Sequence, residues 1–153
     1  MTQPLPVKGE RVDFGADPLA PEPPDVGIAI SLLAGAKPAV FPLAQPVVLH
    51  GSFQADFALL KLCREGLSAS ILVTVIRTDQ PWGKTLRLVT PQAAVVKPEP
   101  TQEPGRDYTH YRQGGQFNFD LAKFFNIPKE PGKYQVEAVM GAYHSQRLEF
   151  ELR

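Results

Sequence analysis

The sequence predicts an all-β protein that folds as a single antiparallel β-sandwich of about seven strands. Short apolar segments rich in β-branched residues recur along the chain, with Gly- and Pro-containing turns between them, and this alternation is typical of a sandwich. A length of 153 residues suits one domain with one core. Apolar residues make up 43% of the chain and charged residues 21%, which is too apolar for general disorder.

The first 25 residues are expected to form a Pro-rich extended arm, followed by the sandwich domain at 26–153. Six of the 16 prolines lie in residues 1–25, and proline lacks the N–H that the interior of a sheet requires. We expect the arm to add little to the core and to serve as a tether or as a strand laid on another surface. Val12 and Phe14 alternate with charged residues and allow a brief pairing at a sheet edge.

Three strands are expected in the first half of the domain, at 27–33, 47–53 and 69–77. In the second of these, the period of two directs His50 and Ser52 outward and places Gly51 on the inner face, where it marks a bulge or close packing. The third is apolar and β-branched and contains no Gly or Pro, which is typical of a central strand.

The segment 56–64 is compatible with two structures. Phe57, Leu60 and Arg64 follow a helical spacing, with Asp56 as N-cap and Gly66 as the stop signal. This spacing favours a short helix that crosses between the sheets. A strand remains the alternative for the same residues.

Four further strands are expected in the second half, at 84–90, 116–121, 133–140 and 144–152. The second of them alternates Phe117, Phe119 and Leu121 with polar residues, as a half-buried antiparallel strand does. The last two strands form a terminal hairpin around Gly141. Residues 91–115 are a long irregular excursion, and loops of this length are uncommon unless they are functional or disordered.

The segment Pro-Gly-Lys-Tyr-Gln-Val-Glu-Ala at 131–138 resembles the corner before the penultimate strand of immunoglobulin-like and fibronectin-III-like domains. The resemblance implies that the hydroxyl of Tyr134 hydrogen-bonds backbone a few residues upstream and locks the corner. Val136 stands where antibody-type domains have a cysteine, so that type is excluded. The remaining modules of this fold serve as accessory, adhesion or linker domains, and the fold does not name a function.

Composition argues against several classes of function. Sixteen basic residues balance sixteen acidic ones without a basic cluster, so we expect no nucleic acid and no membrane insertion. The single cysteine, Cys63, has apolar neighbours and is expected to be buried and inert. No metal-ligand spacing links His50, His110 and His144, and no nucleophile motif is present. We therefore expect no cofactor and no enzymatic activity, and both a cytoplasmic and an exported location stay open.

The loop at 105–115 is the candidate recognition surface. Exposed Tyr and Arg are enriched at binding hot spots. The candidate binding residues are Trp82, Arg106, Tyr108, His110, Tyr111 and Arg112. The alternative is that the tyrosines fold back and cap the core, with Trp82 as a cap as well. The sequence thus predicts a non-catalytic module that binds another protein, or alternatively a small ligand or glycan held by Trp82, Tyr108 and Tyr111.

Overall fold

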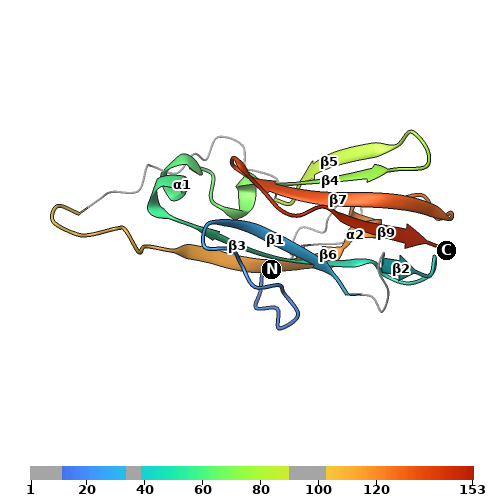
Figure 1. Ribbon diagram of the computed structural model, residues 1–153, viewed down its shortest axis with the longest axis horizontal. Helices are drawn as coiled ribbons and strands as arrows, with labels where there is room; N and C mark the ends of the chain where they lie inside the picture. The colour runs from blue at the N-terminus through green and yellow to red at the C-terminus, as the bar shows by residue number, and fades with distance from the viewer. Residues whose placement is uncertain (1–11, 34–38, 90–102) are drawn as a thin grey trace, which may run out of the picture.

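The computed structural model describes residues 12–33, 39–89 and 103–153, which form two packed β-sheets with short helices at the two ends (Figure 1). The described strands are β1 (Gly27–Leu32), β2 (Ala39–Phe41), β3 (Val48–Ala55), β4 (Ile71–Arg77), β5 (Gly83–Arg87), β6 (Gln113–Asp120), β7 (Gly132–Met140), β8 (Tyr143–His144) and β9 (Leu148–Leu152). The helices are α1 (Phe57–Leu62) and α2 (Leu121–Phe124), with a 3₁₀ turn at Ser68–Ser70. The structure is mostly β and has two sheets, so the β class of the prediction is confirmed, whereas the described residues hold nine strands instead of about seven and a second short helix, α2.

The first sheet is antiparallel and has the order β1-β3-β6. Its register pairs Ile30 with Gly51 and Gly51 with Phe117, so these three residues lie in one row across the inner face.

β6 ends one residue earlier than predicted because Asp120 caps α2. The Asp120 carboxylate accepts hydrogen bonds from the backbone N–H groups of Ala122 and Lys123.

The second sheet is mixed and has the order β2-β9-β7-β4-β5, with β8 also paired to β7. The expectation of a purely antiparallel sandwich is wrong at one place, because β2 runs parallel to β9 and pairs Ala39 with Phe150. The predicted terminal hairpin is confirmed. Its second strand is interrupted between β8 and β9 at 145–147.

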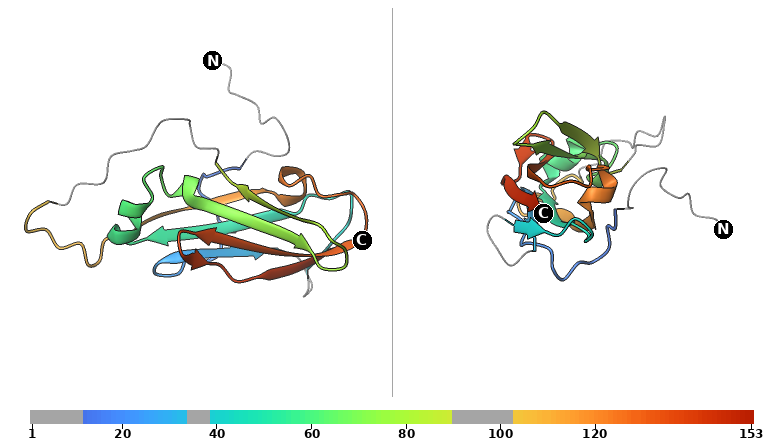
Figure 2. Two further views of the ribbon diagram at one scale, coloured as in Figure 1. Left: turned by 90° about the horizontal axis from the view of Figure 1, so that it is seen from above. Right: turned by 90° about the vertical axis from the view of Figure 1, so that its right-hand side faces the viewer.

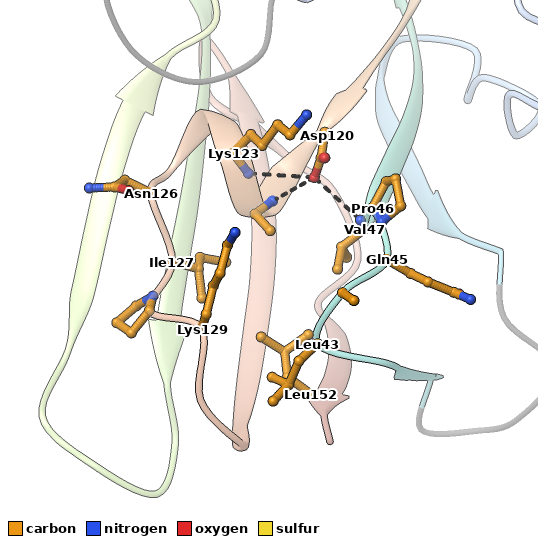
Figure 3. A pocket seen from close by; sticks show the side chains of 13 residues that line it. Leu43, Gln45, Pro46, Val47, Asp120, Lys123, Asn126, Ile127, Lys129 and Leu152 are labelled. Atoms are coloured by element: carbon orange, nitrogen blue, oxygen red, sulfur yellow. Dashed lines mark hydrogen bonds between the residues drawn. The ribbon is translucent and has the colours of Figure 1, made fainter.

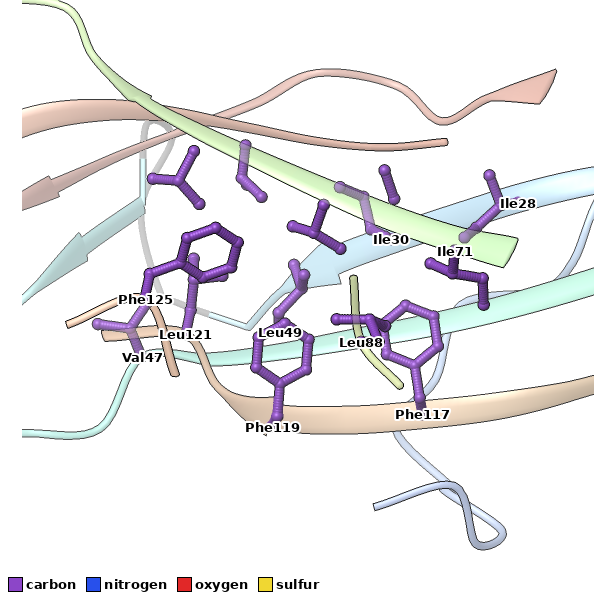
Figure 4. Packing of buried hydrophobic residues seen from close by; sticks show 14 of the residues in the cluster. Ile28, Ile30, Val47, Leu49, Ile71, Leu88, Phe117, Phe119, Leu121 and Phe125 are labelled. Carbon is purple, nitrogen blue, oxygen red and sulfur yellow. The ribbon is translucent and has the colours of Figure 1, made fainter. Parts of the chain in front are cut away.

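The two sheets face each other across one hydrophobic core. Alternate residues of β4 and β7 are buried, including Val73 and Val75 on one strand and Val136 and Ala138 on the other. Figure 4 shows Ile71 of β4 among residues of the opposite sheet. This shared burial of two inner faces is what holds the layers together.

Gly51 lets an aromatic ring lie directly against β3. A Cβ atom at this position would overlap the Phe117 ring, whose side chain is fully buried. Phe117 also packs against Phe53 and Phe119, with ring centroids 6.4 and 6.2 Å apart. The close packing expected at Gly51 is therefore present.

One edge of the first sheet is closed by a side chain. The Gln146 amide donates to the carbonyl of Ile30 at 2.6 Å and accepts from the backbone N–H of Ile30 at 3.4 Å. The amide thus satisfies the two backbone groups of Ile30 that a neighbouring strand would otherwise bond. These bonds join β1 to the segment between β8 and β9.

Residues 12–25 pack on the first sheet instead of forming a separate arm. Asp13 exchanges two 2.9 Å backbone hydrogen bonds with Asn118, which is the brief edge pairing that the alternation of Val12 and Phe14 allowed. Ser52 donates to the carbonyl of Pro21, and Asp17 reaches the buried His50. Residues 1–11 lie outside the described part of the chain, so the tether prediction for them stays a prediction.

The Asp17–His50 pair is almost fully buried. His50 Nδ1 lies 2.6 Å from Asp17 Oδ2, and the two residues are 7% and 6% exposed. Burial by itself raises the pKa of Asp17, but hydrogen bonds from His50 and from the backbone N–H of Leu19 outweigh it and hold the pKa below its usual value. The pair therefore attaches residues 12–25 to the outer face of β3.

Segment 56–64 is a helix, as the spacing favoured. Asp56 caps α1 by accepting from the N–H of Leu59 at 2.8 Å. The buried face consists of Phe57 and Leu59, not Phe57 and Leu60. Cys63 caps the carboxyl end of α1 and is half-buried, so the expectation of a fully buried thiol is wrong.

Gly51→Ala is expected to destabilise the protein by about 1 to 3 kcal/mol, because the new methyl group overlaps the Phe117 ring in a core without spare volume. Urea unfolding measures the change. In a Phe117→Leu background the same substitution should cost less, since the smaller side chain can move aside. Equal costs in both backgrounds would contradict the contact.

Asp17→Asn is expected to lower stability at neutral pH by about 1 to 3 kcal/mol, since a buried charge-assisted hydrogen bond is lost. The pKa of Asp17 is lowered in the folded state, so the stabilisation is complete above the unfolded pKa of about 3.9 and is lost as pH falls through the folded value. The stability difference between wild type and variant should therefore shrink from pH 5 towards pH 2. Parallel curves across this range would show that the carboxylate is not coupled to folding.

Candidate functional site

The structure places a groove between α1 and the outer face of the second sheet. Leu72 on β4 and Val139 on β7 are paired neighbours on this face, and Leu62 and Tyr143 approach them from α1 and β8. The groove has a volume of about 690 Å³. It lies at the end of the molecule where β7 runs into Gly141. We call it the α1 groove.

Exposed apolar side chains distinguish the α1 groove. Leu62 is 80% exposed, Tyr143 38% and Leu72 36%, and all three line it. On the rim, Arg87 donates to Glu65 at 3.0 Å, so these two charges neutralise each other. The surface thus offers apolar contact area next to a paired, polar rim, as protein-binding surfaces do.

The α1 groove was not predicted from the sequence, although one signal for it was present. Ala58 and Leu62 are four residues apart on a short helix and both are exposed. A helix whose outward face is apolar leaves that face without a partner.

The two tyrosines of the predicted recognition loop pack behind α1. The Phe57 ring lies 4.3 Å from Tyr108 and 5.4 Å from Tyr111 between centroids. The Tyr108 hydroxyl accepts from the N–H of Glu103, and the Tyr111 hydroxyl donates to Gln113. Both tyrosines are half-buried, so their rings hold the helix that forms one wall of the groove.

Charged residues of the same loop are paired within the protein. Arg112 donates two hydrogen bonds to the Asp25 carboxylate, at 2.9 and 2.8 Å. The hydrogen bonds from Arg112 lower the pKa of Asp25. Arg106 lies over the Tyr108 ring and 3.6 Å from Glu103, while His110 is exposed. The loop is therefore tied to residues 12–25 and to itself.

Trp82 lies at the opposite end of the molecule from Tyr108 and Tyr111. It meets the Tyr134 ring edge-on at 5.9 Å, beside the start of β7, whereas α1 lies near the other end of β7. Figure 2 shows the β4–β5 hairpin at one end and the loop before β6 at the other. The alternative of a small ligand or glycan held by Trp82, Tyr108 and Tyr111 together requires one shared surface, and the length of β7 separates Trp82 from the two tyrosines.

Tyr134 is buried, but its hydroxyl does not make the corner hydrogen bond. Its ring stacks on Phe150 at 5.2 Å, and the hydroxyl has no hydrogen-bond partner among the described residues. Burial raises the pKa of this hydroxyl. The Arg77 guanidinium, which bonds Asp79 and Glu130, ties the neighbouring turns together. The ion pairs of Arg77 with Asp79 and Glu130 therefore connect these turns, which is the role that the resemblance implied for the Tyr134 hydroxyl.

A buried Asp-His-Ser arrangement lies under residues 12–25. Ser31 is the cross-strand partner of His50, which contacts Asp17, and the Ser31 hydroxyl has no hydrogen-bond partner in the described part of the chain. A nucleophile must be reached by substrate, yet the Ser31 hydroxyl oxygen is inaccessible and His50 is 7% exposed. The arrangement therefore serves to pack this segment.

A second pocket, of about 690 Å³, lies beside α2 and the segment that follows it (Figure 3). Leu43, Ile127 and Leu152 supply apolar walls, and Lys129 extends along it. We call it the α2 pocket. The amine of Lys84 on β5 donates to the carbonyl of Phe125 at 2.9 Å and fixes the end of α2.

Comparison of the sequence with protein-family models and with curated proteins finds no match. Among residues 12–33, 39–89 and 103–153, no helix is long and apolar enough to cross a membrane. Within the same residues, no three His, Cys, Asp or Glu side chains are grouped closely enough to hold a metal ion.

Replacing Tyr108 and Tyr111 together by alanine is expected to destabilise the protein by about 2 kcal/mol, since two aromatic contacts to Phe57 are lost. Hydrogen exchange should accelerate in α1 more than in β4 or β7. His110→Ala, an exposed change in the same loop, is the control and should leave both measurements unaltered. Unchanged exchange in α1 for the double variant would contradict the bracing role.

Proposed function

We propose that this chain is a non-catalytic interaction module that binds a partner protein through the α1 groove. The observation that carries the proposal is the 80% exposure of Leu62 at the edge of a groove that also exposes Leu72 and Tyr143. Exposing these side chains to water is unfavourable, and a partner that covers them gains free energy. Rigid strands hold Leu72 in place, and a capped helix holds Leu62.

The partner surface is expected to present an apolar side chain ringed by polar groups. The groove floor at Leu72 and Val139 is apolar, whereas Glu65 and Arg87 at the rim already neutralise each other. A partner of strong net charge gains little from such a rim. Shape and apolar contact therefore determine affinity here, with Tyr143 as a rigid amphipathic anchor.

We also propose that the domain is immunoglobulin-like. Support comes from the two facing sheets and from the position of Tyr134, buried at the beginning of β7 as the sequence resemblance implies. The parallel pairing of β2 with β9 and the unbonded Tyr134 hydroxyl are departures from the simplest expectation. The proposed binding surface does not depend on this relationship.

Photo-crosslinking from position 62 tests the interaction. Leu62 is replaced by p-benzoylphenylalanine, the captured protein is identified and purified, and its affinity for the unmodified chain is measured by calorimetry. The double variant Leu62→Ser/Leu72→Ser should bind at least about tenfold more weakly, because hot-spot side chains each contribute more than about 1 kcal/mol. Thermal melting checks that the double variant is folded.

Leu19→Ser is the matched control, since Leu19 is 56% exposed and lies in residues 12–25, outside the lining of the groove. It should leave the affinity unchanged. A captured protein that binds the double variant as tightly as the wild type would eliminate the α1 groove as the interaction surface.

A further inference from the structure

β6 is an edge strand of the first sheet, and its outer side is only partly paired (Figure 1). Asp13 exchanges backbone hydrogen bonds with Asn118, so the N–H and C=O groups of Asn118 point away from β3. Backbone groups alternate in direction along an antiparallel strand, and those of Gln116 and Gly114 therefore point the same way. Among the described residues, no hydrogen bond from outside β3 reaches these backbone groups. The edge of β6 is thus open beside the place where Asp13 closes it.

The open stretch at 113–116 lacks the usual protection of a sheet edge. On the other edge of the same sheet, Gln146 bonds the outward N–H and C=O groups of Ile30. Open edges are commonly guarded by charged side chains or proline, but 113–116 reads Gln-Gly-Gly-Gln. The Gln116 side chain is turned aside, since its oxygen accepts from the backbone N–H of Asp17 at 2.8 Å. The stretch is therefore accessible to a strand of another molecule.

A pocket lies on each face of the sheet beside this stretch. The inner pocket has a volume of about 530 Å³ and apolar walls that include Phe53, Leu67 and Val89. It also reaches Gly115, which has no side chain to fill it. The outer pocket has a volume of about 410 Å³ and is more polar, with Ser52 in its lining. Side chains alternate between the two faces of a strand, so a strand added here would direct successive residues into the two pockets in turn.

We propose that the β6 edge, defined as residues 113–116 with these two pockets, binds an extended segment of another protein as an added antiparallel strand. The residues opposite Gly114 and Gln116 exchange backbone hydrogen bonds with them, as Asp13 does with Asn118. The residue between them lies opposite Gly115 and directs an apolar side chain into the inner pocket. Its two neighbours carry small polar side chains on the side of the outer pocket.

A second copy of β6 does not supply the apolar side chain that the inner pocket fits. The residues of β6 that share the inner face are Gln113, Gly115, Phe117 and Phe119. Phe117 is fully buried in its own core and Phe119 is 2% exposed, so neither is free to leave it. Two β6 edges paired with each other would leave the inner pocket unfilled. The bound segment is therefore expected to come from a different protein.

The proposal does not rest on the α1 groove, although the two sites are neighbours. The residues from Cys63 to Gly66 line both the groove and the inner pocket. Val89 lines only the inner pocket, whereas Leu72 lines only the groove. Substitutions at these two positions therefore test the two sites separately.

The peptide acetyl-Ser-Thr-Leu-Thr-Ser-amide is the probe, added at millimolar concentration to the full chain. Two-dimensional NMR should show saturable shifts of the amide signals of Gly114, Gly115 and Gln116. Hydrogen exchange at the Gly114 and Gln116 amides should be fast in the free chain and slow in the complex, because only the added strand bonds them.

Two N-methylated versions of the peptide test the backbone pairing. Methyl groups on both threonine nitrogens remove the donors aimed at Gly114 and Gln116 and should weaken binding at least about tenfold. A methyl group on the leucine nitrogen points away from β6 and should leave the affinity unchanged. All three peptides carry the same side chains, so a difference between them reports the backbone hydrogen bonds.

Matched substitutions test the inner pocket. A peptide with serine in place of leucine should bind about tenfold more weakly, because it buries no apolar side chain. Val89→Ser removes part of the apolar wall and should weaken the leucine peptide, while thermal melting checks that this variant is folded. Leu62→Ser/Leu72→Ser should bind the leucine peptide as the wild type does, so failure of either proposal leaves the other standing.

Four results would overturn the proposal. Slow exchange at the Gln116 amide in the free chain would show that the edge is already paired. Equal affinity for the unmodified peptide and the one methylated on its threonines would exclude an added strand. Equal affinity for the leucine and serine peptides would exclude the inner pocket. Dimerisation of the free chain that protects the Gly114 and Gln116 amides would make a second copy the occupant.

Discussion

The packing of the molecule depends on the absence of a side chain at Gly51. Because Phe117 lies against the bare backbone there, its ring fits into the inner face of β3 and β6, which packs against the opposite sheet. With this layer in place, β3 runs on to Asp56 and α1, and β6 runs on to Asp120 and α2. The two helices, and the surface beside each, are therefore positioned by the same buried contact at the centre of the sheet.

Most strands were predictable, because a strand with one buried face alternates apolar and polar residues along the sequence. The alternation in β6 and β7 is complete enough to place both within one to three residues at each end. β2 was not predictable, since Ala39–Phe41 is only three residues long and pairs with β9 more than a hundred residues away. For residues 12–25 only the brief edge pairing beside Val12 and Phe14 was anticipated. Their attachment by side-chain bonds of Asp17 and Ser52 was not predictable, because the prolines indicate only an extended segment.

The sequence shows which residues are of a type common at binding sites, but what each residue does depends on where the fold places it. Tyr108 and Tyr111 meet each other, as adjacent loop residues can, yet both rings turn towards Phe57. Trp82 could not be placed from sequence, since its distance from the tyrosines is set by the length and direction of β7. The role of Leu62 could not be predicted, because a single exposed leucine on a short helix does not indicate a binding surface. Only the fold brings Leu72 and Tyr143 next to it.

The bonds between Gln146 and Ile30 join residues 116 positions apart in the chain. During synthesis the amino-terminal part leaves the ribosome first. The free edge of β1 is thus made long before the amide that blocks it, and it stays open to pairing with other nascent chains. Protection of this edge follows only after Gln146 has been synthesised, and slow synthesis of the residues between Ile30 and Gln146 would prolong the interval in which the chain is prone to aggregate.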